Sequence, residues 1–252
     1  MMALAGFLVA LAVGLTGVGG GVLMTPVLIL AFGLPPAAAV GTALLFVTVV
    51  KLLAAPVYVA RKEVDYAAAG LLLLGGLPGA WAGVRLHGLF REAHLRPAVL
   101  VVVGGVIVAL ALTSLCQALG RTRAGAGAER KAWLAVIGAP IGVEVGFSSA
   151  GAGALGNLAL LNCTNAGPAK VVGTDLVFGL GLAAAAGGMH LASGNVDAAV
   201  FRQLCLGGIP GALGGAWLAT FLPPRPFRAA LTVVLLYLGS HLVWDGIRSF
   251  AR

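Results

Sequence analysis

The feature that most constrains this chain is an internal repeat. Residues 40–46 read VGTALLF and residues 172–178 read VGTDLVF, at an offset of 132 positions (172 − 40 = 132). The offset holds without a gap over most of each half, so GGIPGA at 207–212 falls on GGLPGA at 75–80. The unit is about half the chain, far longer than a solenoid repeat of about 20 to 50 residues. We therefore predict two fused copies of one domain.

Composition decides which solvent these copies fold in. The chain has 252 residues, of which 60% are hydrophobic and 10% are charged, whereas an ordinary soluble domain has about 25% charged residues. One globule cannot bury that much apolar surface, so lipid must be the solvent. The 39 glycines let helices approach closely. We predict an all-α polytopic protein of the cell inner (plasma) membrane.

The charge pattern excludes several other classes of protein. The net charge is +8, but the basic residues form short clusters between apolar runs, as is typical of residues that flank membrane spans. Nucleic-acid binding is therefore not expected. Cys116, Cys163 and Cys205 are isolated, and membrane packing explains them better than disulfide, redox or metal chemistry. We expect no metal and no cofactor. The first apolar run continues directly into a repeat unit, which does not indicate a removable signal peptide.

Each copy contains two short apolar runs followed by three long ones. A bilayer core requires about 20 helical residues, so the long runs should cross it. The short pairs could form re-entrant hairpins or abbreviated crossings. Either way the number of crossings per copy is odd, which inverts the second copy relative to the first. The short pairs are 3–16 with 20–33 and 132–146 with 152–163, and the long runs are 38–60, 66–86, 97–118, 170–192, 199–221 and 229–249.

This pattern divides the chain into a first membrane repeat (1–118), a linker (119–131) and a second membrane repeat (132–252). The linker is the most basic stretch, which predicts a cytoplasmic location and places both termini outside. The loop at 61–65 contains two basic residues and its counterpart at 193–197 contains none, as inversion requires. Against inversion, the basic residues Arg91 and Arg96 are matched by basic residues at 225 and 228 in the second copy.

Glycine-rich segments separate the two short runs of each copy: GLTGVGGG at 14–21 and GFSSAGAG at 146–153. A helix that starts after such a break directs free N–H groups and a positive dipole end toward it, which favours an anion. The glycines could instead serve helix packing alone. Because the segment is duplicated, we favour a binding site. The candidate substrate-binding residues here are Gly19, Gly20, Gly21, Thr25, Ser148, Ser149, Gly151, Gly153 and Asn157.

Charged side chains inside apolar runs form a second candidate group. Lys51 lies about 15 Å from the end of its span, Glu144 directly precedes the second break, and Asp175 lies one turn into a long span. An ionisable group at such depth costs about 2.5 to 3.5 kcal/mol and requires a partner or a polar cavity. The alternative to function is a structural ion pair of Lys51 with Asp175 or Glu144. Three further charged residues near span ends can reach water: Lys170, Arg202 and Asp245.

The deep charges are not shared by the two copies, since the counterparts of Asp175, Lys51 and Glu144 are alanines at positions 43, 183 and 12. The symmetric residues therefore build the scaffold, and departures from symmetry place the charges. Thr42 and Thr174 are shared by the two copies, and each could bind the substrate or cap a helix. Lys51 is a further candidate substrate-binding residue. His190, near the end of a span, is a candidate for proton coupling, although such a histidine is more often a hydrogen-bonded interior residue.

The residues resemble the TauE/SafE family of sulfite exporters and related membrane permeases. The resemblance rests on GLTGVGGGVLMTPVL, LPPAAAVGTALLF and GGLPGAWAG in the first copy, and on GFSSAGAGAL, PAKVVGTDLVF and GGIPGALGG in the second. It implies a protein with about eight spans that exports or imports sulfite, sulfonates or similar small anions. Two departures, Ala43 in place of an acid and Ala152 with Asn157 in the second break, suggest that one half determines selectivity.

Three functions compete. The first is a secondary transporter of a small anion by alternating access, with Lys51 as the counter-charge and Glu144 or Asp175 exchanging a proton. The second is an intramembrane serine hydrolase that pairs Ser148 or Ser149 with His190 or His241. The third is a passive anion channel. We favour the transporter and expect no enzyme. Its expected partners are a small anionic substrate and the lipid bilayer, and a second copy of the chain in a homodimer is a further candidate.

Overall fold

The computed structural model describes residues 1–16, 19–89, 96–118, 131–218 and 224–250. These residues form helices and no strand, so the all-α prediction is confirmed for this part of the chain. The linker predicted at 119–131 lies outside the described residues except for Lys131. The helices are α1 (Met2–Thr16), α2 (Gly20–Leu30), α3 (Pro36–Ala60), α4 (Tyr66–Leu89), α5 (Arg96–Ala118), α6 (Trp133–Ser148), α7 (Ala152–Cys163), α8 (Pro168–Ala192), α9 (Ala198–Leu218) and α10 (Pro224–Phe250).

Each apolar run of the sequence corresponds to one of these helices, with ends that differ by a few residues. Proline begins both α3 and α8, where its fixed φ and missing N–H suit the first helical turn. By length and composition, three helices of the described part can cross a membrane: α3, α4 and α8. Their apolar character supports a membrane protein. Crossing by the other three long runs stays a prediction.

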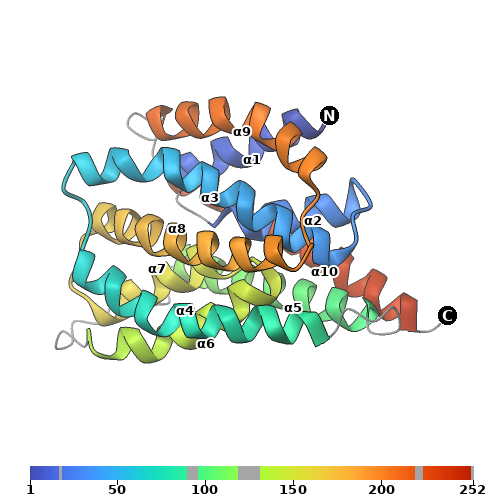
Figure 1. Cartoon of the computed structure of the whole chain (residues 1–252). Helices are drawn as coiled ribbons and strands as arrows, with labels where there is room; N and C mark the ends of the chain where they lie inside the picture. Colours follow the sequence, from blue (N-terminus) through green and yellow to red (C-terminus); the bar gives the residue numbers. More distant parts are fainter. Residues whose placement is uncertain (17–18, 90–95, 119–130, 219–223, 251–252) are drawn as a thin grey trace.

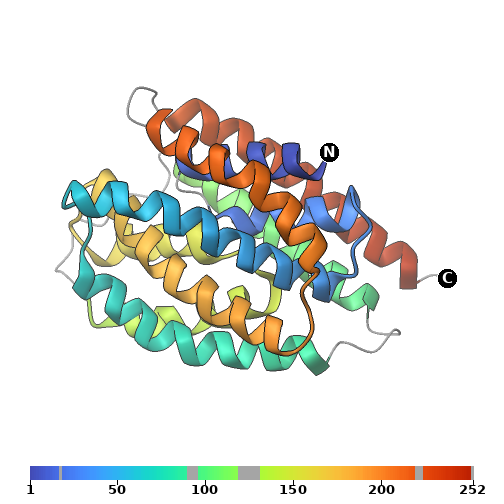
Figure 2. The same cartoon turned by 45° about the horizontal axis from the view of Figure 1, so that its top comes forward.

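The helices form layers around a central pair. α3 and α8 lie side by side in the middle, with α1 and α9 on one side and α4 and α6 on the other (Figures 1 and 2). α5 packs against α10. Each extensive helix contact is matched by a contact between the equivalent helices of the other copy. α1 packs on α9 as its equivalent α6 packs on α4, and α3 contacts α9 as its equivalent α8 contacts α4. The two copies are thus interleaved rather than placed end to end.

Glycines set the closest of these packing contacts. Three glycines of α4 each lie so near a backbone carbonyl of α6 that a β-carbon would overlap it, and three of α9 contact α1 in the same way. Small residues at four-residue spacing allow this backbone approach in membranes. Successive glycines along α4 contact residues of α6 that have successively higher residue numbers. The two helices therefore run parallel. The glycines are Gly75, Gly79 and Gly83 of α4 and Gly207, Gly211 and Gly215 of α9.

The chain direction places equivalent loops at opposite ends of the bundle. The connection at 61–65 lies at one end, and the connection at 193–197 lies at the other, where α1 begins and α10 ends (Figure 1). α1 begins beside the first half of α9, and α2 ends near the start of α3, at this same end. α1 and α2 therefore form a hairpin with both outer ends on one side. α6 and α7 form the corresponding hairpin from the other end (Figure 1).

Candidate functional site

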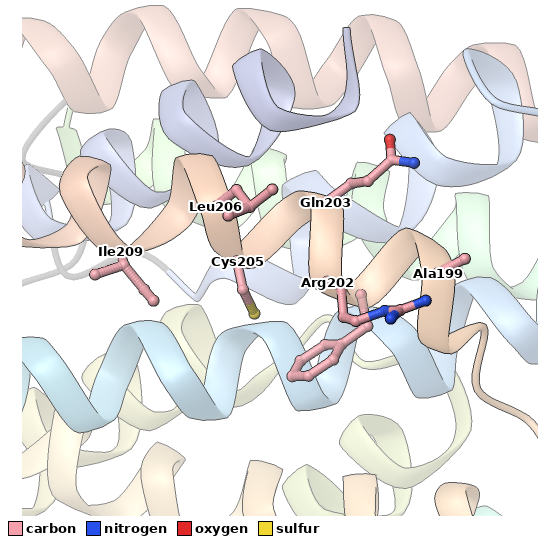
Figure 3. Close-up of a pocket in the computed structure, with 7 residues that line it drawn as sticks. Ala199, Arg202, Gln203, Cys205, Leu206 and Ile209 are labelled. Atoms are coloured by element: carbon pink, nitrogen blue, oxygen red, sulfur yellow. The ribbon is translucent and has the colours of Figure 1, made fainter.

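A hollow of about 540 Å³ lies on the outer surface of α9 (Figure 3). Its lining is mostly apolar and includes Phe201, Cys205 and Ile209, with Arg202 also present. None of the predicted site residues contributes to it. The hollow is therefore separate from the candidate site, which lies inside the bundle.

The structure brings the two glycine-rich breaks together. A β-carbon on Gly19 would lie 2.8 Å from the Gly153 nitrogen, and one on Gly21 would overlap the Ser149 carbonyl oxygen. Thr25 Oγ1 is 2.5 Å from Ser149 Oγ, and both side chains are buried. The tips of the two hairpins thus meet, and the first residues of α2 and α7 are neighbours. The predicted glycine at position 20 packs against side chains of α1 and α3.

Glu144 lies at the tip of the second hairpin. Its Oε1 accepts a hydrogen bond from the Ser148 hydroxyl, whose oxygen in turn accepts the Ala150 N–H at 3.2 Å. Its Oε2 is buried and has no hydrogen-bond partner among the described residues. This oxygen lies against Gly151, where a β-carbon would overlap it. The carboxylate is therefore folded back onto the start of α7.

Lys51 and Asp175 form a fully buried ion pair between α3 and α8. The Lys51 Nζ is 3.8 Å from Asp175 Oδ2, and neither side chain is exposed. The Nζ has no hydrogen-bond partner among the described residues. Two glycines make room for the pair, Gly179 beside the ammonium and Gly156 beside the carboxylate. Of the two acids predicted as partners for Lys51, the structure pairs it with Asp175.

The first turns of α7 connect these two groups. Asp175 contacts α7 at Gly156, the fifth residue of this helix, and Glu144 contacts its start at Gly151. Asn157 follows directly, with a buried Oδ1 that has no hydrogen-bond partner among the described residues. The two acids predicted from the sequence, together with the lysine paired to one of them, are thus arranged along the first half of α7.

His190 has a structural partner. Its Nε2 lies 2.9 Å from the Gly146 carbonyl oxygen, and His87 Nδ1 lies 2.8 Å from that of Phe147. These carbonyls belong to the last turn of α6, where the helix itself provides no donor. The two rings also meet edge to face, with centroids 5.3 Å apart. His87 was not predicted, because nothing in its sequence neighbourhood shows that it faces α6.

No serine–histidine hydrogen bond links Ser148 or Ser149 to His190 or His241 in the described part of the chain. His190 contacts the backbone of α6, and His241 lies 3.2 Å from Asp245 on a partly exposed face of α10. The observed contacts thus provide no support for the serine-hydrolase alternative.

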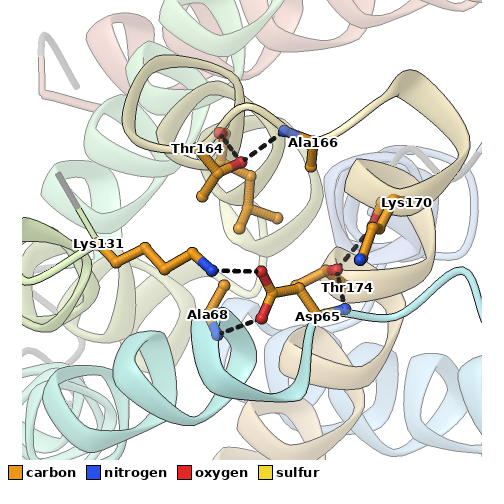
Figure 4. Close-up of polar contacts among 8 residues, drawn as sticks. Asp65, Ala68, Lys131, Thr164, Ala166, Lys170 and Thr174 are labelled. Carbon is orange, nitrogen blue, oxygen red and sulfur yellow. Dashed lines mark hydrogen bonds and ion pairs between the residues drawn. The ribbon is translucent and has the colours of Figure 1, made fainter. Parts of the chain in front are cut away.

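Thr42 and Thr174 connect the two copies. The Thr174 hydroxyl accepts the Asp65 N–H at 2.9 Å, and the Thr42 hydroxyl accepts the Asp197 N–H at 3.0 Å. Asp65 in turn caps α4 through the Ala68 N–H at 3.0 Å (Figure 4). Each hydroxyl thus contacts the residue directly before a helix of the opposite copy, and substrate binding by these threonines stays a prediction.

Asp65 is also paired with a cation from the end of the linker. Lys131 Nζ lies 3.0 Å from Asp65 Oδ2 (Figure 4). Partial burial alone raises the pKa of the Asp65 carboxyl, but the Ala68 N–H and the Lys131 ammonium outweigh it and lower this pKa below its ordinary value. The pair shows that the loop at 61–65 and the end of the basic linker lie at the same end of the bundle.

Comparisons with known proteins indicate a family of membrane transporters. A family model described as "Sulfite exporter TauE/SafE" matches residues 2–242. The chain is 30% identical over 249 residues to "Probable membrane transporter protein YjnA" of Bacillus subtilis (strain 168), covering 95% of this chain and 98% of that protein. It is 25% identical over 260 residues to "Probable membrane transporter protein YunE" of the same organism, covering 93% of each. No solved structure matches the chain.

Proposed function

Because this chain belongs to the sulfite exporter TauE/SafE family, we propose that it is a secondary transporter of a small sulfur oxyanion, either sulfite or an organosulfonate. It would act by alternating access in the cell inner membrane. The names of its relatives support a membrane transporter rather than an enzyme.

The observation that carries the proposal is the buried Lys51–Asp175 pair. An ammonium group in the membrane interior is costly unless it is paired and hydrogen-bonded. Lys51 has an ion-pair partner at 3.8 Å but no hydrogen bond among the described residues. Charge-assisted hydrogen bonds to an oxyanion would satisfy its N–H groups. We therefore assign Lys51 as the counter-charge of the transported anion.

The arrangement of the hairpins supports an inverted repeat with a central site. α1 and α2 contain 15 and 11 residues, or about 22 and 16 Å, whereas a bilayer core is about 30 Å thick. With both outer ends on one side, such a pair re-enters the membrane without crossing it. Three crossings per copy then remain, which inverts the copies. The facing starts of α2 and α7 would place positive dipole ends at the substrate.

Proton coupling is assigned to Asp175, which is buried, and to Glu144, which is partly buried. Asp175 neutralises Lys51 in the observed state, so an anion that binds Lys51 leaves this carboxylate in need of a proton. Asp175 contacts α7 at Gly156, and Glu144 contacts the start of the same helix at Gly151. We propose that one of these acids takes up a proton when the anion binds, and that the anion and the proton cross together.

A flux assay in proteoliposomes tests the proposal. Sulfite, sulfate, thiosulfate, sulfoacetate and small carboxylates are supplied with and without a pH gradient. We expect uphill accumulation of a sulfur oxyanion when the gradient is imposed, whereas a passive channel would only equilibrate it. Lys51→Met should weaken binding at least tenfold, about 1.4 kcal/mol, and Lys170→Met is the matched control at a partly exposed position.

Two results would contradict separate parts of the proposal. If none of these anions binds or moves, the substrate class is wrong. If Asp175→Asn combined with Glu144→Gln leaves both transport and its pH dependence unchanged, the proton coupling is wrong while the anion transport stands.

A further inference from the structure

The Glu144 carboxylate occupies a position where a bound substrate anion would also be stabilised. Its Oε2 lies against Gly151 at the start of α7, where a β-carbon would overlap it. The first N–H groups of a helix have no partner within the helix, and the helix dipole adds positive potential there. Because α2 starts beside α7 at the meeting hairpin tips, the carboxylate lies near two helix starts.

The first copy lacks this carboxylate. The residue that corresponds to Glu144 is Ala12 (144 − 132 = 12). The glycines of the two tips are otherwise related, since those at 19 and 21 correspond to those at 151 and 153. The duplicated scaffold therefore contains an internal anion at one of its two helix starts.

Buried polar atoms around α7 indicate that this region serves a ligand. Buried polar groups in folded proteins are ordinarily hydrogen-bonded. Lys51 Nζ, Glu144 Oε2 and Asn157 Oδ1 have no hydrogen-bond partner among the described residues. Lys51 is fully buried, and its partner Asp175 contacts α7 one turn beyond the break. Buried polar atoms without hydrogen bonds destabilise a fold, so their presence together here points to a role in binding.

We propose that Glu144 is a tethered anion that competes with the transported anion for the start of α7. This inference rests on the proposed function, because it assumes that an anion binds at the hairpin tips. The Ser148 hydroxyl holds the carboxylate in place when no substrate is bound. A sulfite or sulfonate group presents oxygens of similar size and charge and displaces it.

If Glu144 competes with the substrate, removing its carboxylate should lower the apparent Kd, whereas removing an ordinary binding residue should raise it. The apparent Kd equals the intrinsic Kd divided by the fraction of molecules in which the site is free. If Glu144 occupies the site in about nine molecules of ten, removing the carboxylate lowers the apparent Kd about tenfold. A residue that contacts and stabilises the substrate would raise the Kd when removed.

The experiment measures sulfite binding by purified full-length protein with isothermal titration calorimetry. The wild type is compared with Glu144→Ala, Glu144→Gln and Ala12→Glu. We expect Glu144→Ala to bind sulfite about tenfold more tightly and Glu144→Gln to bind it more tightly than the wild type. Ala12→Glu adds a carboxylate to the first copy and should weaken binding. Thermal unfolding without sulfite confirms that each variant is folded.

The outcomes separate this inference from the proposed function. If the wild type binds sulfite and Glu144→Ala and Glu144→Gln bind it equally or less tightly, the tethered-anion role is wrong. If Glu144→Ala does not fold, Glu144→Gln alone decides the question. If neither the wild type nor any folded variant binds sulfite, sulfate, thiosulfate or sulfoacetate, the proposed function fails, and the inference fails with it.

Discussion

At the residue scale, Asp65 combines a helix cap with an ion pair. Its carboxylate accepts the Ala68 N–H at the third residue of α4 and lies 3.0 Å from the Lys131 Nζ. An acidic N-cap satisfies a free donor and interacts favourably with the helix dipole. Both interactions favour the charged carboxylate, so they strengthen the contact only while Asp65 is ionised. The contact joins the first copy to the end of the linker.

This residue predicts an acid-sensitive contribution to stability. The folded-state pKa lies below the ordinary value of 3.8, so the contribution is complete above that value and is lost as the pH falls through the lowered pKa. Asp65→Asn keeps a capping side chain and should lower the Tm near neutral pH, with a smaller further loss toward about pH 3 than in the wild type. Thermal unfolding in detergent measures this. Lys131→Met should also reduce the acid-dependent loss, and equal pH profiles in all three proteins would contradict the prediction.

At the element scale, the position of each glycine on a helix determines its importance. Gly79 of α4 lies against the Ala139 carbonyl of α6, where a β-carbon would overlap backbone. Gly70, on the same helix, is exposed, and a β-carbon there would have no atom within 4 Å. Association of membrane helices depends on such close packing, because lipid provides no hydrophobic driving force between them.

Gly79→Val should therefore destabilise the protein, whereas Gly70→Val should have little effect. Overpacking typically costs about 1 to 3 kcal/mol, and displacement of the α6 backbone places Gly79→Val at the upper end of that range. Thermal unfolding in detergent and the yield of monodisperse protein measure the difference. Similar Tm values for the two variants would show that the α4–α6 contact is less tight than the structure indicates.

At the scale of the whole molecule, two equivalent contacts hold the copies together at opposite ends. Thr174 accepts a hydrogen bond from the loop of the first copy, and Thr42 accepts one from the loop of the second. Both threonine side chains are buried, with exposed fractions of 1% and 0%. In the proposed alternating-access cycle one end opens while the other stays closed, and these contacts lie where the two ends would separate.

Thr42→Val and Thr174→Val should each destabilise the protein by about 1 to 3 kcal/mol, because each leaves a backbone N–H without its acceptor. The two contacts lie at opposite ends, so the double variant should lose about the sum of the single effects. Thr48→Val is the control, since the Thr48 hydroxyl bonds to Leu44 within α3 rather than to the other copy. Denaturant unfolding measures all four. A large loss in Thr48→Val, or no loss in the other two, would contradict the assignment.

Much of the architecture follows from the sequence alone. The repeat offset and the lengths of the apolar runs predicted each helix of the described chain, because local hydrophobicity and the turn residues that interrupt it determine where a membrane helix begins and ends. The same pattern identified Lys51, Glu144 and Asp175, since a charge within an apolar run is visible without a structure.

Only the tertiary structure decided how these residues are paired. The sequence left Lys51 with two possible partners, and the packing of α3 on α8 placed it beside Asp175. The hydrogen bonds of Thr42 and Thr174 to loops of the opposite copy, the contact of His87 with α6 and the meeting of the hairpin tips also join residues far apart in the chain. Hydrophobic periodicity reports which residues face lipid or protein, but it contains no information about which helix of the other copy each residue meets.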